Sequence, residues 1–164
     1  MPLSTLCLHC GMCCDGTLFT HVSLQPGEVA TLQRRGVPVG QRADGSPALV
    51  QHCAALEGRT CTAYGERPAG CRRYQCQLFS ALAEKEVSLE EALAVVEEAH
   101  ALREAVEREL PGAEPGAPRS VMQRARHAAR ADAQTPLSER AQAAYARAEA
   151  FLDSRFRGRF GRRG

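Results

Sequence analysis

Eight cysteines constrain this chain more than any other feature, and all of them lie between Cys7 and Cys76 of its 164 residues. Large apolar side chains are scarce, because the chain has no Trp, 3 Tyr and 5 Phe. A segment of fewer than about 80 residues gains only about 3–5 kcal/mol from its apolar core. We therefore expect the cysteine-rich segment to be held together by disulfides or by a metal.

The redox compartment decides between disulfides and a metal, because disulfides persist in oxidising surroundings and reduced thiols bind metal. The first ten residues have no basic stretch, and Ser, Thr, His and Cys interrupt their apolar positions. We therefore expect no signal peptide, no membrane span and a cytoplasmic protein. Eight cysteines in an oxidising compartment would instead allow 105 disulfide pairings.

The spacing of the first four cysteines, C-x2-C-x2-C-C, is typical of a metal site, because two intervening residues can turn two thiolates toward one ion. It also begins like an iron–sulfur pattern, although the adjacent pair Cys13 and Cys14 departs from it. Neighbouring side chains on an extended backbone point to opposite sides. If both are ligands, they serve two metal atoms or one of them bridges.

A second group of four cysteines follows after residue 50 and completes a set of eight thiolates, enough for two tetrathiolate ions or for a cluster with spare ligands. The predicted metal ligands are Cys7, Cys10, Cys13, Cys14, Cys53, Cys61, Cys71 and Cys76. The predicted cofactor is Zn²⁺ or Fe, with an iron–sulfur cluster as one form of the latter. The histidines that flank cysteines and are alternative ligands are His9, His21 and His52.

Several residues beside the cysteines have expected supporting roles. Arginines offset the negative charge of thiolates, and two tyrosines pack over the metal loops. The arginines are Arg59, Arg67, Arg72 and Arg73, and the tyrosines are Tyr64 and Tyr74.

These motifs resemble a known family. The pattern Cys7-x2-Cys10-Gly-x-Cys13-Cys14, followed by Cys53 and by Cys61-x2-Tyr64-x2-Arg67-Pro68-x2-Cys71-Arg72-x-Tyr74-x-Cys76, is similar to the CxxCxxCC zinc- or iron-chelating family, also called the YkgJ family of cysteine-cluster proteins. The resemblance covers roughly residues 5–80. It implies metal chelation and, through related flagellin lysine N-methylases, an iron–sulfur centre.

The predicted fold class is α+β, mostly α. We expect an irregular cysteine-rich loop over 1–22, a short helix over about 26–35 that begins near Pro26, and a hairpin within 48–64 with Cys53 and Cys61 on its two arms. Residues 1–83 then form a cysteine-cluster domain. Residues 84–164 form a helical extension, with a Pro/Gly linker near 111–118 and an Arg-rich tail.

Helical signals are clearest in the extension. Ser88 and Glu91 form a capping-box signature before a helix that ends at Pro111. A weaker helix is expected over 120–130, and another that is capped by Thr135. The tail from Arg155 onward is expected to be mobile.

The extension is divided by charge. Residues 84–114 carry 3 basic and 10 acidic residues, whereas residues 115–164 carry 11 Arg and 4 acidic residues. Opposite charges on adjacent segments are expected to pair with each other. Arg and Phe in the tail would also suit nucleic acid, but no recognisable nucleic-acid-binding module is present.

Three functions follow as hypotheses. The first is a metal-binding protein in which thiolate-bound zinc or iron organises the fold. The second is an iron-dependent or iron–sulfur enzyme, for which the sequence identifies no catalytic residue. The third is an interaction module whose helices bind a protein partner.

Overall fold

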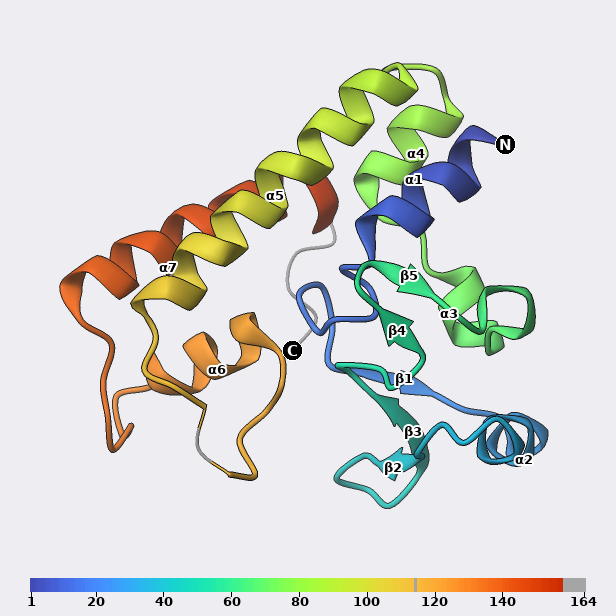
Figure 1. The fold of residues 1–164 in the computed structure, drawn as a ribbon, viewed down its shortest axis with the longest axis horizontal. Helices are drawn as coiled ribbons and strands as arrows, with labels where there is room; N and C mark the ends of the chain where they lie inside the picture. The colour runs from blue at the N-terminus through green and yellow to red at the C-terminus, as the bar shows by residue number, and fades with distance from the viewer. Residues whose placement is uncertain (114, 158–164) are drawn as a thin grey trace.

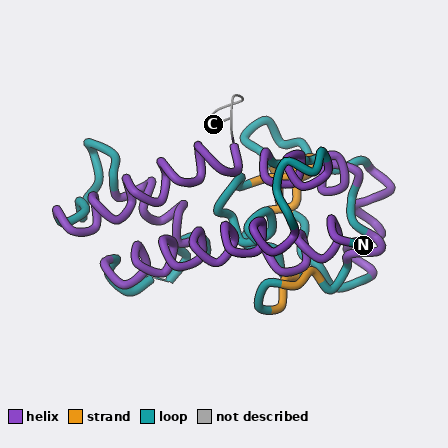
Figure 2. The backbone as a smooth tube through the Cα atoms, turned by 90° about the horizontal axis from the view of Figure 1, so that it is seen from above, coloured by secondary structure: helices purple, strands orange, loops and turns teal. Residues whose placement is uncertain are grey.

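The computed structural model describes residues 1–113 and 115–157 and confirms a fold that is mostly α with few strands (Figure 1). In chain order the elements are α1 (Pro2–Cys10), β1 (His21–Ser23), α2 (Pro26–Arg34), β2 (Gly40–Gln41), β3 (Pro47–Val50), β4 (Leu56–Glu57), β5 (Thr60–Cys61), the 3₁₀ turn η1 (Tyr64–Glu66), α3 (Ala69–Arg73), α4 (Gln77–Ala83), α5 (Leu89–Glu109), α6 (Val121–Ala128), α7 (Glu139–Leu152) and the π-helical turn η2 (Asp153–Arg157). Figure 2 shows that the strands gather toward one end of the molecule and that helices extend toward the other.

The strands form two small antiparallel sheets. One has three strands in the order β1-β3-β2, and the other is the two-stranded pair β4-β5. The helix predicted over 26–35 is confirmed as α2, which begins with Pro26 in its first turn.

The expected loop over residues 1–22 is wrong in its first half, because Pro2–Cys10 forms α1. A helix places residues three positions apart on one face, so the spacing of Cys7 and Cys10 brings them together without a loop. Gly11 ends this helix with a φ of 66°. A Cβ there would lie 2.6 Å from the carbonyl oxygen of Arg59, so the close approach of the β4-β5 turn requires glycine.

The hairpin predicted within 48–64 is present but shorter than expected. Glu57 pairs with Thr60 across a turn that contains Gly58. Cys61 lies on β5 as predicted, whereas Cys53 lies three residues before β4 and is not on a strand. The β3 strand, which also falls within 48–64, pairs instead with β1 and β2.

The predicted helices of the second half are present, with one correction. Ser88 and Glu91 form the capping box of α5, and Ser120 caps α6. The predicted cap at Thr135 is wrong: α7 begins after Ser138, whose hydroxyl accepts a hydrogen bond from the backbone N–H of Ala141. Ser138 thus satisfies one of the free N–H groups at the first turn of α7.

The pairing of the acidic and basic segments is confirmed. Arg124 lies 3.9 Å from Glu107, and Arg140 lies 3.3 Å from Glu109. These ion pairs join α5 to α6 and α7. Of the helices described, none has both the length and the apolar character needed to cross a membrane.

The buried apolar side chains form two clusters that meet beside the cysteines. One cluster lies among α1, α4, α5, α6, α7 and η2, and the other among β1, α2, β3 and the β4-β5 region. Phe19, in the segment between α1 and β1, packs against both clusters. The cysteine-rich segment is therefore the junction between two small cores.

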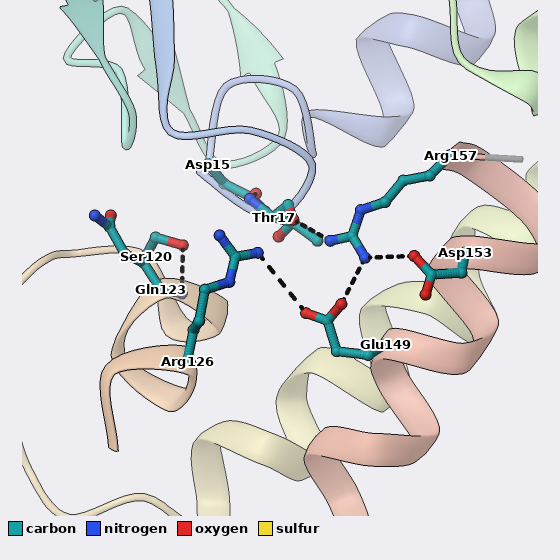
Figure 3. Close-up of polar contacts among 8 residues, drawn as sticks. All are labelled: Asp15, Thr17, Ser120, Gln123, Arg126, Glu149, Asp153 and Arg157. Carbon is teal, nitrogen blue, oxygen red and sulfur yellow. Dashed lines mark hydrogen bonds and ion pairs between the residues drawn. The ribbon is translucent and has the colours of Figure 1, made fainter. Parts of the chain in front are cut away.

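A buried ionic contact ties the end of the described chain to the cysteine-rich loop (Figure 3). Arg157 donates to Glu149 at 2.6 Å, to Asp153 at 3.0 Å and to the backbone carbonyl of Thr17 at 3.0 Å. The side chains of Arg157 and Glu149 are 4% and 3% exposed. The tail from Arg155 was expected to be mobile, but residues 155–157 continue as helix, with Phe156 and Arg157 buried. The rest of that tail, 158–164, lies outside the described residues.

We expect Arg157→Met to lower the free energy of unfolding by about 3–5 kcal/mol, because it leaves the buried carboxylate of Glu149 without its main counter-charge. The matched control is Arg140→Met, which removes an Arg that is 85% exposed and should cost no more than about 1 kcal/mol. Urea denaturation followed by circular dichroism measures both. Equal losses in the two variants would contradict the role given to Arg157.

Candidate metal centre

All eight cysteines line one cavity of about 90 Å³, whose wall also includes Val96 of α5 and Phe156 of η2. They reach it from α1, from the loop after α1, from the segments around the β4-β5 pair, from α3 and from the start of α4. All eight are free, and none is more than partly exposed. Spacings that look unrelated in the sequence thus converge on one place in the fold.

The electrostatic influences among the thiols divide them into two groups of four. In the first group, burial raises the pKa of the Cys13 thiol, and the sulfurs of Cys10, Cys76 and Cys7 raise it further. Burial is also the main cause of the raised pKa of Cys10, to which Cys76 and Cys7 contribute. Cys10, Cys13 and Cys76 also all pack against the helical core.

The second group is Cys14, Cys53, Cys61 and Cys71. A hydrogen bond joins the sulfurs of Cys14 and Cys61, raising the pKa of Cys14 and lowering that of Cys61. The pKa of the Cys71 thiol is raised to about 11, first by burial and then by the sulfurs of Cys53 and Cys61. All four belong to, or pack against, the other apolar cluster.

The adjacent pair Cys13 and Cys14 divides between the two groups. The pair lies in a turn and not on the extended backbone assumed from the sequence, because the N–H groups of Cys14 and Asp15 both donate to the carbonyl of Gly11 at 3.0 Å. Of the thiols that mainly shift the pKa of Cys14, Cys61 and Cys53 belong to its own group, and Cys13 alone belongs to the first group. The C-C step therefore links the two groups along the chain.

Hydrogen bonds to the backbone hold the cysteine-rich loop in place, and the sequence did not reveal two of their donors. Gln51 Nε2 donates to the carbonyl of Cys13 at 2.8 Å, and His100 Nε2 donates to the carbonyl of Cys10 at 2.6 Å. Both side chains are buried at 3% exposure. Gln51 immediately precedes His52 and Cys53, whereas His100 lies in α5 with no cysteine near it in the sequence.

Burial keeps most of these thiols protonated at neutral pH. It raises the pKa of Cys10 to about 12 from an ordinary value of 9.0. Two sulfurs accept backbone hydrogen bonds, which favour the ionised form: Cys76 accepts from Phe79 at 3.3 Å, and Cys53 from Ala55 at 3.4 Å. A metal ion would have to displace protons from these thiols in order to bind them.

The predicted supporting residues behave differently from one another. Tyr64, Arg67 and Tyr74 line the cavity, and Arg67 stacks 3.7 Å over the ring of Tyr64 while its Nε donates to the Tyr64 carbonyl. The charge of Arg67 acts on Cys7, Cys61 and Cys71 and favours their thiolates. The cavity wall does not include the other predicted arginines or the alternative histidine ligands. These are Arg59, Arg72, Arg73, His9, His21 and His52.

The donor set suits a metal that binds thiolate: eight free sulfurs, all buried or half-buried, line one cavity and have the guanidinium of Arg67 beside them. Among the described residues, however, no three His, Cys, Asp or Glu side chains meet at one point as the ligands of a single ion would. Binding therefore requires cysteine side chains to turn inward.

Comparison with known families agrees with this chemistry. The model of the CxxCxxCC family, described as "Putative zinc- or iron-chelating domain", matches residues 6–99. The chain belongs to the CxxCxxCC family. The match contains all eight cysteines and ends within α5. No curated protein and no solved structure matches the chain.

We expect the chain without metal to lose stability as the pH rises from about 9 toward 12. The folded state holds protons on Cys10 and Cys71 up to pKa values of about 12 and 11, whereas an unfolded cysteine releases its proton near 9.0. The stability that these neutral thiols contribute is complete below pH 9 and is lost as the pH rises through the folded-state values.

Urea titrations at pH 8, 9.5 and 11, on chelator-treated and metal-loaded protein, measure this effect. The metal-loaded protein should show a much smaller decline, because its thiols are already ionised. The same alkaline decline in both samples would contradict the assignment.

Proposed function

We propose that this CxxCxxCC protein binds metal at two neighbouring four-thiolate sites, with zinc or iron organising its fold. The first site would use Cys7, Cys10, Cys13 and Cys76, and the second Cys14, Cys53, Cys61 and Cys71. The observation that carries the proposal is that all eight sulfurs line one cavity and divide into two groups, each beside its own apolar cluster. Four thiolates complete a closed structural zinc site.

The energetics support a role in folding. Structural zinc contributes about 10–16 kcal/mol of apparent binding free energy, whereas a core as small as the cluster around β1, α2 and β3 contributes only about 3–5 kcal/mol. Ions at the two sites would join the clusters at their junction. The proposal requires reduced thiols and so fits the expected cytoplasmic location.

A second candidate is an iron–sulfur centre in the same cavity. Its volume of about 90 Å³ is several times the roughly 10–15 Å³ that one water molecule needs by the same measure, so it has room for inorganic sulfide as well as metal. Four cysteines also complete the ligand set of a [2Fe–2S] or [4Fe–4S] cluster. Iron and sulfide in equal amounts, in a brown protein, would favour this candidate over zinc.

Single Cys→Ser variants test the division into two sites. Purified without oxygen, the wild-type chain should hold two centres, and Cys76→Ser and Cys71→Ser should each lose one of them. The double variant should hold none, because each substitution breaks a different four-thiolate set. Metal and sulfide per chain, from elemental analysis and acid-labile sulfide assay, are the measurements.

Tyr74→Phe is the matched control, because it changes the cavity wall without removing a sulfur and should keep both centres. Loss of all metal in either single Cys variant would show one shared centre and contradict the division. A wild-type chain that holds no metal and keeps its fold in chelator would contradict the proposed function.

A further inference from the structure

A second cavity, of about 70 Å³, lies beside the cysteine cavity and has a different character. Cys10 and Gly11 contribute to the walls of both. The remaining wall of the smaller cavity is largely basic. Its charged and titratable side chains other than Cys10 are Asp15, His52, Arg59, His100, Arg103 and Arg119.

Three guanidinium groups face this cavity and only one carboxylate does. Asp15 lies 3.9 Å from Arg103, which is also 3.9 Å from Glu107, and Arg59 pairs with Glu97 outside the cavity wall. Arg119 forms no ion pair and no side-chain hydrogen bond with any residue in 1–113 or 115–157. The wall therefore has an excess of positive charge that those residues do not neutralise.

Buried polar atoms in the same wall also lack hydrogen-bond partners within the described chain. They are His52 Nδ1, His100 Nδ1 and Arg103 Nε, and the last of these lies 3.9 Å from Asp15 Oδ2, beyond hydrogen-bond distance. His100 is 3% exposed, and its other ring nitrogen already donates to the Cys10 carbonyl. Buried polar atoms are normally hydrogen-bonded, so atoms left free around one cavity point to a polar ligand.

The chemistry of these groups selects the ligand. Arginine presents N–H groups in a fork that matches an oxyanion. Because His100 donates through Nε2, its Nδ1 in the neutral ring is an acceptor and suits an O–H group. The volume is enough for a polyatomic ion and too small for a nucleotide.

We propose that this cavity binds free hydrogen phosphate. Arg103 and Arg119 donate to its oxygens, and His100 Nδ1 accepts its O–H. His100, Arg103 and Arg119 all follow residue 99, where the family match ends. The helical extension of this chain thus adds an anion site next to the cysteine centre.

Calorimetric titration of the full chain, carrying its metal, with inorganic phosphate against chloride of equal ionic strength tests the proposal. Wild-type protein should bind phosphate, and Arg119→Gln should weaken binding about tenfold by removing one charge-assisted contact. Asp15→Asn should strengthen it, because it removes the one opposing carboxylate and keeps an oxygen for the Thr17 N–H. Arg42→Gln, in the β2–β3 turn and outside the cavity wall, is the control and should bind like wild type.

Metal per chain, measured before and after titration, should not change, which separates this site from direct contact of phosphate with the metal. Sulfate lacks an O–H at neutral pH, and so does a phosphate monoester, whose second pKa is about 6. Both should therefore bind more weakly than inorganic phosphate. Absence of phosphate binding by the wild type would overturn the proposal. So would equal binding by wild type and Arg119→Gln, or phosphate that binds only by removing metal.

Discussion

The rest of this structure depends on the convergence of eight sulfurs between two small apolar clusters. The cluster around β1, α2 and β3 is small, and the chain has few bulky apolar side chains with which to enlarge it. Burial of a thiol at such a junction disfavours its charged form, so the sulfur is stable there when it is protonated or bound to a cation. The raised pKa values of Cys10, Cys13 and Cys71 reflect the cost of burying a thiolate. A bound metal would neutralise the thiolates and so remove this cost.

The helical extension is part of this arrangement rather than an independent appendage. Arg157 reaches back to the carbonyl of Thr17, and His100 holds the carbonyl of Cys10. A Cβ on Gly16 would lie 2.5 Å from the Cβ of Ser120, so the residue that caps α6 packs closely against the cysteine-rich loop. The boundary expected between residues 83 and 84 stays a prediction, and these contacts join the segments on its two sides.

The sequence predicted local features well where one residue type decides them. Ser88 with Glu91 fixed the start of α5, and Pro26 the start of α2, because caps and proline act within a single turn. It failed where two local signals compete: Thr135 with Pro136 suggested an earlier start for α7, but Ser138 provides the cap. The C-x2-C spacing suits a loop or a helix equally, and only packing of α1 against α4 and α5 selects the helix.

The candidate site was predictable as a set of residues but not as an arrangement. Eight cysteines and a family resemblance identified the sulfurs, and the Cys13-Cys14 step suggested two groups. Which distant cysteine joins which group depends on tertiary packing, which places Cys76 beside Cys7 and Cys71 beside Cys53. His100 and Arg119 could not be found from sequence because nothing near them resembles a ligand motif.

X-ray absorption at the metal edge of anaerobically purified protein tests the central claim most directly. The account predicts a first shell of four sulfur atoms around each metal, at about 2.3 Å if the metal is zinc. A first shell dominated by nitrogen or oxygen would contradict it, as would native protein whose cysteines are joined to one another as disulfides.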